Sequence, residues 1–491
     1  MRTTSFLSVL ALAALLAGLW GEQQWLSSAL GQQAAAQDQK KPDATKEAKK
    51  PVIAIVGADI YTVTKGTIRG GIVLIQDGKI IRAGQDIAIP EGATRIDATG
   101  KVVTPGFVTV SATNLALRAL GTPAPGGDQP APGSGGAQGK FADSLNPFDR
   151  NILFCLGSGI TTACVEVNAG FGGRFGRDPE DLDDTRLCPC CGLPILPTEP
   201  ITPAAPTERT ARRQAVLKMT YGDMSAMLVK ESPFYHLPPG AFAGALNRHQ
   251  WRDTIKRARQ QIKDQAMADA GIDAGDAPAR GGQQRRAIPE EVLKLVERKI
   301  PLRTEASSVE QMRDMIALAK ELDYSLVLDG VQEAWLIASE LGAAKAQAVL
   351  TPRLRRRPSP GKEDSSGGSI ETSAHLEKAG VAFAVAPLNT SVSLDGIPGR
   401  DLTSLALEAA FAVRGGCSEQ TALEALTINP ARMLGLADRI GSIEEGKDAD
   451  LLILDGPPLD YRTYVETAVV GGRIYYDRDR DKIYPDKSRR P

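Results

Sequence analysis

The chain has 491 residues and a balanced charge, with 58 basic and 59 acidic residues. This balance disfavours a nucleic acid or a membrane surface as the main partner. The length allows about two to four domains, and a hydrophobic content of 42% is ordinary for a globular protein. The 49 glycines and 32 prolines predict long loops, and the chain has only three histidines.

The N-terminal residues have the composition of an export signal. Arg2 supplies a positive region, residues 6–20 are uncharged and mostly apolar, and the small residues at 34–36 follow. We expect residues 1–36 to be a cleaved signal peptide, with a retained membrane anchor as the alternative. The mature protein is then expected in the periplasm or outside the cell, free of the membrane. Residues 37–50 are charged and poor in apolar side chains, which predicts a disordered tether.

Short β-rich runs occur near both ends of the remaining chain. The first group covers residues 51–104, where Asp77-Gly78 between two apolar runs is typical of a two-residue hairpin turn. The second group covers residues 441–480 and reads as two more strand pairs. We therefore predict one β-sandwich whose two parts, 51–104 and 441–480, come from opposite ends of the chain.

Residues 105–440 alternate strand and helix patterns, which predicts a parallel sheet, either closed into a barrel or doubly wound. Ser308 and Gln311 form a capping box ahead of a helical pattern, and residues 401–416 predict an amphipathic helix that ends at glycines. The expected strands are 159–167, 214–219, 300–306, 324–330, 346–352 and 381–387.

Three insertions interrupt this body. The second contains CPCCG, in which Cys188 and Cys191 form half of a zinc knuckle. A complete site needs two more ligands, and Cys155, Cys164 and His236 are candidates by elimination. Disulfides or free thiols are the alternative in an exported protein, so a structural zinc at Cys188 and Cys191 stays open. The insertions are expected at 121–140, 171–212 and 271–287.

Two long runs flank the body: GIVLIQDGKIIRAG…IDATGKVVTPGF at 71–107 and ALTINPARMLGLADRIGSIEEGKDADLLILDG at 425–456. They resemble the amidohydrolase superfamily, most closely its imidazolonepropionase-like branch. The resemblance implies an α/β fold, a (β/α)8 TIM-type barrel with a composite β-sandwich formed from both termini. It also implies one or two divalent metals, usually zinc, at the C-terminal ends of the strands, where a metal-bound hydroxide attacks a C–N or related bond.

On the first barrel strand, the family's Asp-x-His-x-His run would fall on Thr109, Ser111 and Thr113. Residues two apart on a strand point the same way, which suits a pair of histidine ligands. Neutral hydroxyls are poor zinc ligands, since imidazole and carboxylate are the usual ones. This departure from the family's ligand pattern therefore predicts a degenerate barrel with no metal or other cofactor at its mouth.

The later ligand positions also carry other residues. The family's lysine on strand 4 would be Lys218, which is otherwise an ordinary solvated lysine. The remaining positions would fall near Glu305 on strand 5, Asp329 or Gly330 on strand 6, and Leu388 on strand 8. The three histidines of the chain lie elsewhere, at 236, 249 and 375.

Three carboxylates, Glu166, Glu305 and Asp329, fall near the C-terminal ends of expected strands. They are candidate catalytic residues, because such a set binds a hard cation or works as an acid–base pair. Alternatively they are solvated or pair with loop arginines. The basic run at 353–358 either holds an anionic ligand or is a solvated loop.

The leading interpretation is an exported amidohydrolase-like pseudoenzyme that binds a small molecule at the barrel mouth. The alternative is an active hydrolase of C–N bonds other than peptide bonds, of the cyclic amide or amidine type. Its site would be rebuilt from Glu166, Glu305 and Asp329, with zinc or another divalent cation as cofactor. A third reading is an assembly subunit that uses 171–212 as its contact surface. The oligomeric state stays open.

Overall fold

A computed structural model of the chain describes residues 51–117, 141–167, 213–237, 241, 244–271, 288–393 and 399–483. All of these belong to one compact unit, Pro51–Pro491. The expected signal peptide and tether, the insertions at 121–140 and 171–212, and nearly all of 271–287 lie outside the described residues. No helix in the described ranges has both the length and the apolar character needed to cross a membrane.

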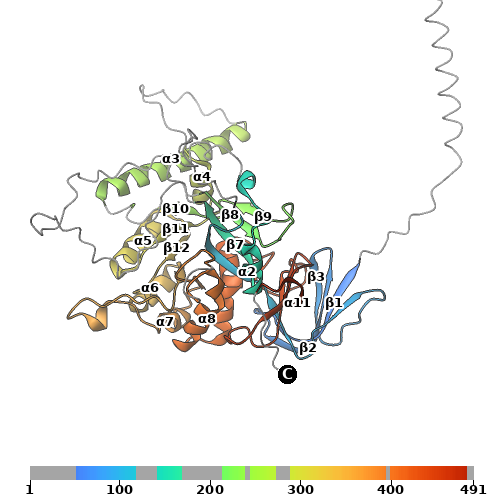
Figure 1. Cartoon of the computed structure of the whole chain (residues 1–491). Helices are drawn as coiled ribbons and strands as arrows, with labels where there is room; N and C mark the ends of the chain where they lie inside the picture. Colours follow the sequence, from blue (N-terminus) through green and yellow to red (C-terminus); the bar gives the residue numbers. More distant parts are fainter. Residues whose placement is uncertain are drawn as a thin grey trace, which may run out of the picture. The chain divides into compact units, whose positions relative to one another are not determined.

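Strands from both ends of the described chain form one eight-stranded sheet (Figure 1). Its order is β17-β16-β15-β5-β1-β2-β3, with β4 paired to β1. The N-terminal strand β5 is the direct neighbour of the C-terminal strand β15, so the two ends share one hydrogen-bonded layer. The bounds are β1 Val52–Tyr61, β2 Thr67–Gln76, β3 Lys79–Gly84, β4 Thr94–Asp97, β5 Val102–Pro105, β15 Leu451–Leu454, β16 Val465–Val470 and β17 Arg473–Asp477.

Local turn chemistry sets the register of this sheet. The expected hairpin turn is confirmed, since Asp77 and Gly78 join β2 to β3 with φ of 52° and 75°. The pair β16–β17 is also confirmed, and Gly471-Gly472 forms its turn. Residues 441–450, expected as a strand, instead form a loop that bonds to β3 through Ile80 N to Lys447 O at 2.9 Å.

Each strand expected in the body is present, and the strands form two further sheets. The five-stranded sheet, β10-β11-β12-β13-β14, is parallel throughout. The four-stranded sheet, β6-β7-β8-β9, is parallel only between β6 and β7. The bounds are β6 Phe107–Thr113, β7 Ile160–Val167, β8 Arg213–Lys218, β9 Leu228–Glu231, β10 Tyr235–Leu237, β11 Leu302–Glu305, β12 Leu326–Asp329, β13 Gln347–Leu350 and β14 Phe383–Val385.

The direction of β8 differs from that of a TIM-barrel strand. Its register with β7 is antiparallel, and Val167 lies opposite Arg213 while Thr162 lies opposite Lys218. The N-terminal residue Gln214 is therefore level with Glu166 near the C-terminal end of β7. Lys218, at the other end of β8, lies toward the N-terminal ends of β6 and β7.

The two sheets surround one inner apolar core, although hydrogen bonds among the described residues do not close them into a barrel. This mixed α/β arrangement is consistent with a TIM-type fold. The loop after β14 contacts β6 directly, because Thr113 N donates to Thr390 O at 2.9 Å. The inner core includes Val108, Val110, Cys164, Val216, Phe234, Val327, Val349 and Ala384.

Helices cover the outer faces of these strands (Figure 1). The predicted capping box is confirmed, since Ser308 Oγ accepts from Gln311 N and Gln311 Oε1 accepts from Ser308 N. The helix expected at 401–416 begins only at Leu405, after a 3-10 turn. The helices are α2 Asn151–Gly157, α3 Ala245–Asp269, α4 Glu290–Val296, α5 Val309–Leu322, α6 Ala338–Ala343, α7 Thr372–Lys378, α8 Leu405–Arg414, α9 Glu419–Leu426, α10 Ile428–Met433 and α11 Arg478–Asp481, with 3-10 turns η1 Phe141–Ser144, η4 Ala334–Leu336, η5 Glu363–Ser365 and η6 Leu402–Ser404.

The junction between the eight-stranded sheet and β6 requires a residue without a side chain. Gly106 N donates to Asp450 O at 2.9 Å, and a Cβ added at Gly106 would overlap the buried Thr161 side chain. We expect Gly106→Ala to destabilise the fold by about 1 to 3 kcal/mol through overpacking, measured by urea unfolding. Gly244→Ala is the control, because nothing lies within 4 Å of its added Cβ. Equal unfolding free energies of Gly106→Ala and Gly244→Ala would contradict the close packing of Gly106 against Thr161.

Candidate functional site

The C-terminal ends of β6, β7, β11, β12, β13 and β14 are here called the mouth, and a buried arginine lies at its centre. Arg303 of β11 is 2% exposed, and its Nε donates to Asp329 Oδ2 at 2.8 Å. Its Nη1 donates to Val110 O at 2.6 Å and lies 3.8 Å from Glu166 Oε1, while its Nη2 donates to Ser111 Oγ. One guanidinium therefore joins β6, β7, β11 and β12.

A bulge in β6 makes this contact possible. The register between β6 and β7 shifts between Thr109 and Ala112, so one segment presents both the Val110 carbonyl and the Ser111 hydroxyl to Arg303. Thr109 Oγ1 donates to Ser111 O at 2.9 Å, which holds the bulge locally. Thr109, at the Asp position of the family's Asp-x-His-x-His run, thus shapes the backbone. Ser111, at the first His position, accepts a hydrogen bond from Arg303.

The surroundings of Arg303 keep it charged. Burial lowers its pKa, but the carboxylates of Asp329 and Glu166 outweigh burial and raise the pKa above its ordinary value. The guanidinium lies 5.0 Å from the centre of the Phe234 ring. Glu166 is 6% exposed and also accepts from Gln214 Nε2 at 3.1 Å. The mouth therefore holds a compensated and largely desolvated charge network.

The structure brings two of the three candidate carboxylates to the same group. Glu166 and Asp329 both face Arg303, whereas Glu305 is exposed at the end of β11. Glu305 is the Cα partner of Asp329 across β11 and β12, so the two residues end adjacent strands. Asp329 Oδ1 is buried and has no hydrogen-bond partner in the described part of the chain.

The other positions implied by the resemblance hold no cluster of metal ligands. Thr113 Oγ1 lies 3.2 Å from Thr390 Oγ1, and Leu388 is 48% exposed. Across the ranges that the structure describes, no group of three or more His, Cys, Asp or Glu residues could hold a metal ion. His249 and His375 are paired on helix surfaces with Asp253 and Glu371, at 3.2 Å and 4.0 Å.

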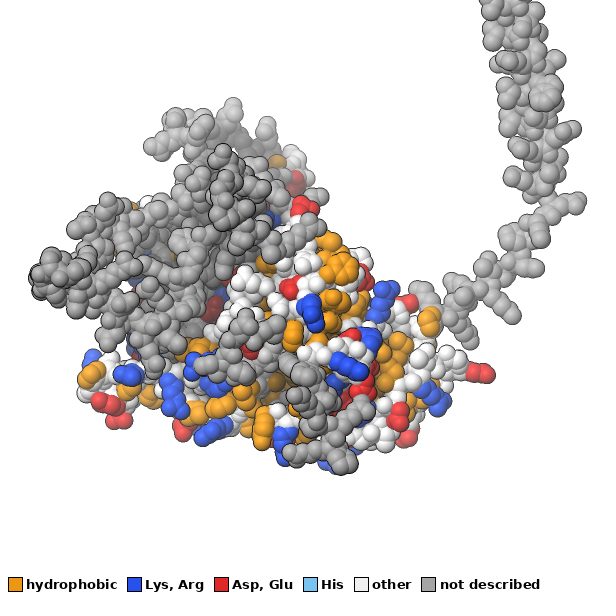
Figure 2. Space-filling model, in the orientation of Figure 1, with side chains coloured by type: hydrophobic (Ala, Val, Ile, Leu, Met, Phe, Trp, Pro, Cys, Tyr) orange, Lys and Arg blue, Asp and Glu red, His pale blue; other side chains and the backbone are white. Residues whose placement is uncertain are grey.

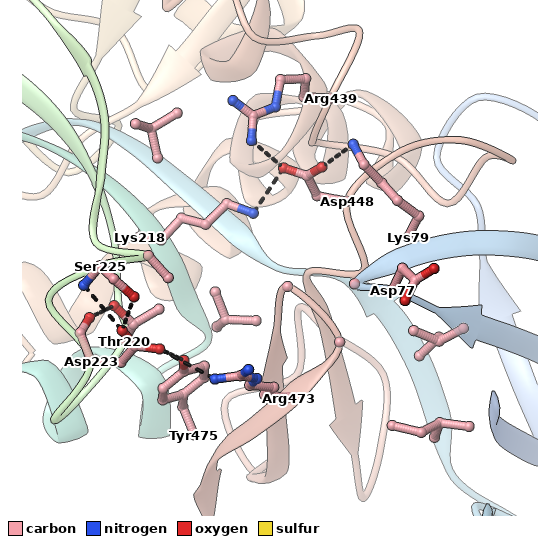
Figure 3. Close-up of a pocket in the computed structure, with 18 of the residues that line it drawn as sticks. Asp77, Lys79, Lys218, Thr220, Asp223, Ser225, Arg439, Asp448, Arg473 and Tyr475 are labelled. Carbon is pink, nitrogen blue, oxygen red and sulfur yellow. Dashed lines mark hydrogen bonds and ion pairs between the residues drawn. The ribbon is translucent and has the colours of Figure 1, made fainter. Parts of the chain in front are cut away.

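Lys218 lies away from the mouth, contrary to its placement on strand 4 of the family barrel. Because β8 is antiparallel, Lys218 Nζ donates to Asp448 Oδ2 at 2.9 Å (Figure 3). It also donates to Asp450 Oδ1 at 3.0 Å. It is 7% exposed, so it is not a solvated lysine either. Asp448 also receives Lys79 and Arg439, and the three cations converge on one carboxylate beside a cavity of about 750 Å3.

The basic run at 353–358 is partly an internal ion pair. Arg353 Nε and Nη2 donate to Glu408 Oε1 at 2.8 Å and 2.6 Å, and Glu408 is fully buried on α8. Arg356 lies 3.7 Å from Glu333. Arg353 therefore already serves as the partner of Glu408 through Nε and Nη2, which disfavours an anion-binding role for it.

The cysteine cluster at 188–192 lies outside the described residues. Of the further zinc-ligand candidates, Cys155 and Cys164 are buried free thiols, and burial raises the pKa of each. His236 lies on β10, opposite Arg303 of β11.

The sequence analysis did not identify Arg303 as a site residue, although the expected strand at 300–306 contains it. Their spacing gave one signal, because Arg303 and Glu305 are two residues apart on a strand and so their side chains lie on the same face of the sheet. The family's histidine ligand on this strand corresponds to Glu305, so the resemblance gives no role to Arg303.

Comparisons with known proteins agree on the family. A profile of the Amidohydrolase family matches residues 375–475. An imidazolonepropionase from Clostridium tetani (strain Massachusetts / E88) is 30% identical over 187 residues, 35% of this chain and 45% of that protein. The crystal structure of an amidohydrolase from Thermotoga maritima MSB8 has a TM-score of 0.60 and 25% identity, covering 87% of this chain and 100% of that one. The chain belongs to the amidohydrolase superfamily.

Within the amidohydrolase superfamily this chain is imidazolonepropionase-like. An N-acetylglucosamine-6-phosphate deacetylase from Danio rerio is 38% identical over 65 residues, 13% of this chain and 15% of that protein. The matches span less than half of the length of these curated relatives. Both relatives are hydrolases of C–N bonds.

Replacing the buried cation is expected to be costly. Arg303→Met leaves two buried carboxylates without their positive partner, so we expect a loss of about 3 to 5 kcal/mol in unfolding free energy. The control is Arg313→Met, which breaks an ion pair to Glu340 whose side chains are 56% and 46% exposed. That variant is expected to lose less than about 1 kcal/mol. Urea unfolding of both proteins checks the difference, and similar losses would argue against a buried charge network.

Asp448 is expected to make the fold sensitive to acid. Burial raises its pKa, but Lys79, Lys218 and Arg439 outweigh burial and lower the pKa from 3.8 to about 2. A depressed carboxyl pKa adds stability above about pH 4 that is lost as pH falls toward about 2. Asp448→Asn should therefore be less stable than the native protein at neutral pH, and the gap should close between about pH 4 and 2. A gap independent of pH, in chemical unfolding across this range, would rule out the linkage.

Proposed function

We propose that the guanidinium of Arg303 takes the place of the superfamily's catalytic divalent metal, and that the protein is a ligand-binding pseudoenzyme. The observation that carries this proposal is the contact of Arg303 with Ser111, Asp329 and Glu166. A guanidinium has only N–H donors and no lone pair for a metal. Two of its partners, Ser111 and Asp329, stand at positions where the resemblance places metal ligands.

The residues present do not fit a divalent metal at this position. Ser111 and Thr113 stand where the resemblance places two histidines, and hydroxyls hold zinc poorly. Asp329 already accepts from Arg303, and a second cation next to a buried guanidinium would be repelled. The charge that a metal would supply is already covalently part of β11.

The mouth is suited to a ligand that donates hydrogen bonds. Asp329 Oδ1 is a buried acceptor without a partner among the described residues, and Glu305 ends the adjacent strand. Such acceptors favour N–H groups, since an unmet buried acceptor costs free energy. We therefore propose a small neutral compound with amide N–H groups as the ligand.

The second candidate function is hydrolysis of a C–N bond by a rebuilt carboxylate site. Relatives of the superfamily, an imidazolonepropionase and a deacetylase, favour it. Here Glu305 and Asp329 would move protons at the substrate while Arg303 and Glu166 position them. The adjacent strand ends of Glu305 and Asp329 are the observation in its favour.

The setting of this function is also proposed. Residues 1–36 would direct export to the periplasm or the cell exterior, and 51–104 with 441–480 would form the composite β-sandwich around the barrel. A zinc ion, if bound, would be structural and held at Cys188 and Cys191. Neither a nucleic acid nor a membrane is proposed as a partner of the mature chain.

Metal analysis tests the proposal. We expect purified protein that has been incubated with zinc and then desalted to retain no zinc bound by residues of the mouth. The double variant Cys188→Ser, Cys191→Ser removes the structural cysteines, so its zinc content should fall to that of the buffer. Stoichiometric zinc in this variant would contradict the pseudoenzyme. Turnover of cyclic amides that Glu305→Gln and Asp329→Asn abolish, without any metal requirement, would instead favour the rebuilt site.

A further inference from the structure

A second cavity lies at the opposite end of the parallel strands from the mouth. Its volume is about 500 Å3, within the range of small-molecule sites. The residues that immediately precede β11, β12, β13 and β14 all line it, so we call it the base cavity. These residues are Pro301, Ser325, Ala346 and Ala382.

Among the described residues that line the base cavity, every charged side chain is a cation. They are Lys230, Arg298, Lys299, Lys345 and Arg432, which come from β9, the loop before β11, the loop before β13, and α10. The chain as a whole is nearly neutral, and the face in Figure 2 mixes basic and acidic side chains. Five cations around one cavity are therefore a local concentration of charge.

Three of these cations have no ion pair with a carboxylate in the described ranges. Arg298 pairs with Asp323, and Lys299 lies 2.8 Å from Glu297, neither of which lines the cavity. Lys230 Nζ donates to Leu434 O at 2.8 Å, and Arg432 Nη1 donates to Asn429 Oδ1 at 2.8 Å. Lys345 is exposed at the rim. The cavity thus carries an excess of about three positive charges, counted by these pairings.

Lys230 is the cation of this group whose charged form is disfavoured by its surroundings. Its side chain is partly buried, and its Nζ donates to a neutral acceptor, the carbonyl of Leu434. Burial and repulsion from Lys294 lower its pKa, with Asp438 opposing them in part. An anion in the cavity would relieve this repulsion, so binding would stabilise the folded chain.

We propose that the base cavity binds a small phosphorylated compound with at least two negative charges, held by Lys230, Lys345 and Arg432. Lysine acts as a point charge and arginine as a forked donor toward phosphate oxygens, so this mixture suits a diphosphate-like group. The site is independent of the mouth, because no residue of the Arg303 network lines it. Its position at the N-terminal ends of the strands suits control or anchoring rather than chemistry.

Calorimetric titration of the full chain with inorganic pyrophosphate, at constant near-physiological ionic strength, tests the proposal. We expect saturable binding by the native protein. Lys230→Met should weaken it at least about tenfold, as should the double variant Lys345→Met, Arg432→Met, since each lost charged contact is worth about a factor of ten. The control is Lys65→Met, an exposed lysine in the β1–β2 turn, which should bind as the native protein does.

Two readouts separate misfolding from loss of binding. Lys345 and Arg432 are exposed, so their variants should keep the native circular dichroism spectrum and unfolding temperature. Pyrophosphate should also raise the unfolding temperature of the native protein and of Lys65→Met, and should raise that of Lys230→Met less at the same concentration. No heat of binding with the folded native chain, or equal affinity in all variants, would overturn the proposal. Neither result would bear on the function proposed for the mouth.

Discussion

A buried positive charge must be surrounded by acceptors, and in this protein that requirement organises the mouth. The guanidinium of Arg303 is almost fully enclosed, so it needs a carboxylate from β12, a second from β7, and oxygen acceptors from β6. The bulge in β6 supplies a carbonyl and a hydroxyl from consecutive residues. Removing any of these partners would leave charge uncompensated in a medium that screens it poorly.

A second charged cluster lies at the other end of β8. Asp448 binds Lys79 from β3, Lys218 from β8 and Arg439 from the loop after α10. It therefore links the eight-stranded sheet to the strands around the inner core (Figure 3). Between the two clusters the inner core is apolar. β8 reaches both clusters, with Gln214 bonded to Glu166 and Lys218 bonded to Asp448. Polar networks of this kind fix strand direction and register, because a shifted strand would bury unmatched charges.

The sequence predicted features that depend on neighbouring residues. The Asp77-Gly78 turn, the Ser308 capping box and the apolar strands of the body follow from local conformational preference and alternation. The direction of β8 was not predictable in this way, since an apolar run of six residues reads the same for either direction. The role of Arg303 was also missed, because its partners are contributed by strands far apart in the chain and by a bulge that alternation alone does not reveal.

The pairing of Val167 with Arg213 has a consequence for how this chain tolerates change. The segment that separates them leaves and rejoins the sheet at neighbouring positions. Its length can therefore vary by gain or loss of residues while the flanking ladder is preserved, at an entropic cost that grows only slowly with length. A graft of foreign sequence between these two residues would place new chemistry next to the ends of β6 and β7, on a scaffold that need not rearrange to accept it.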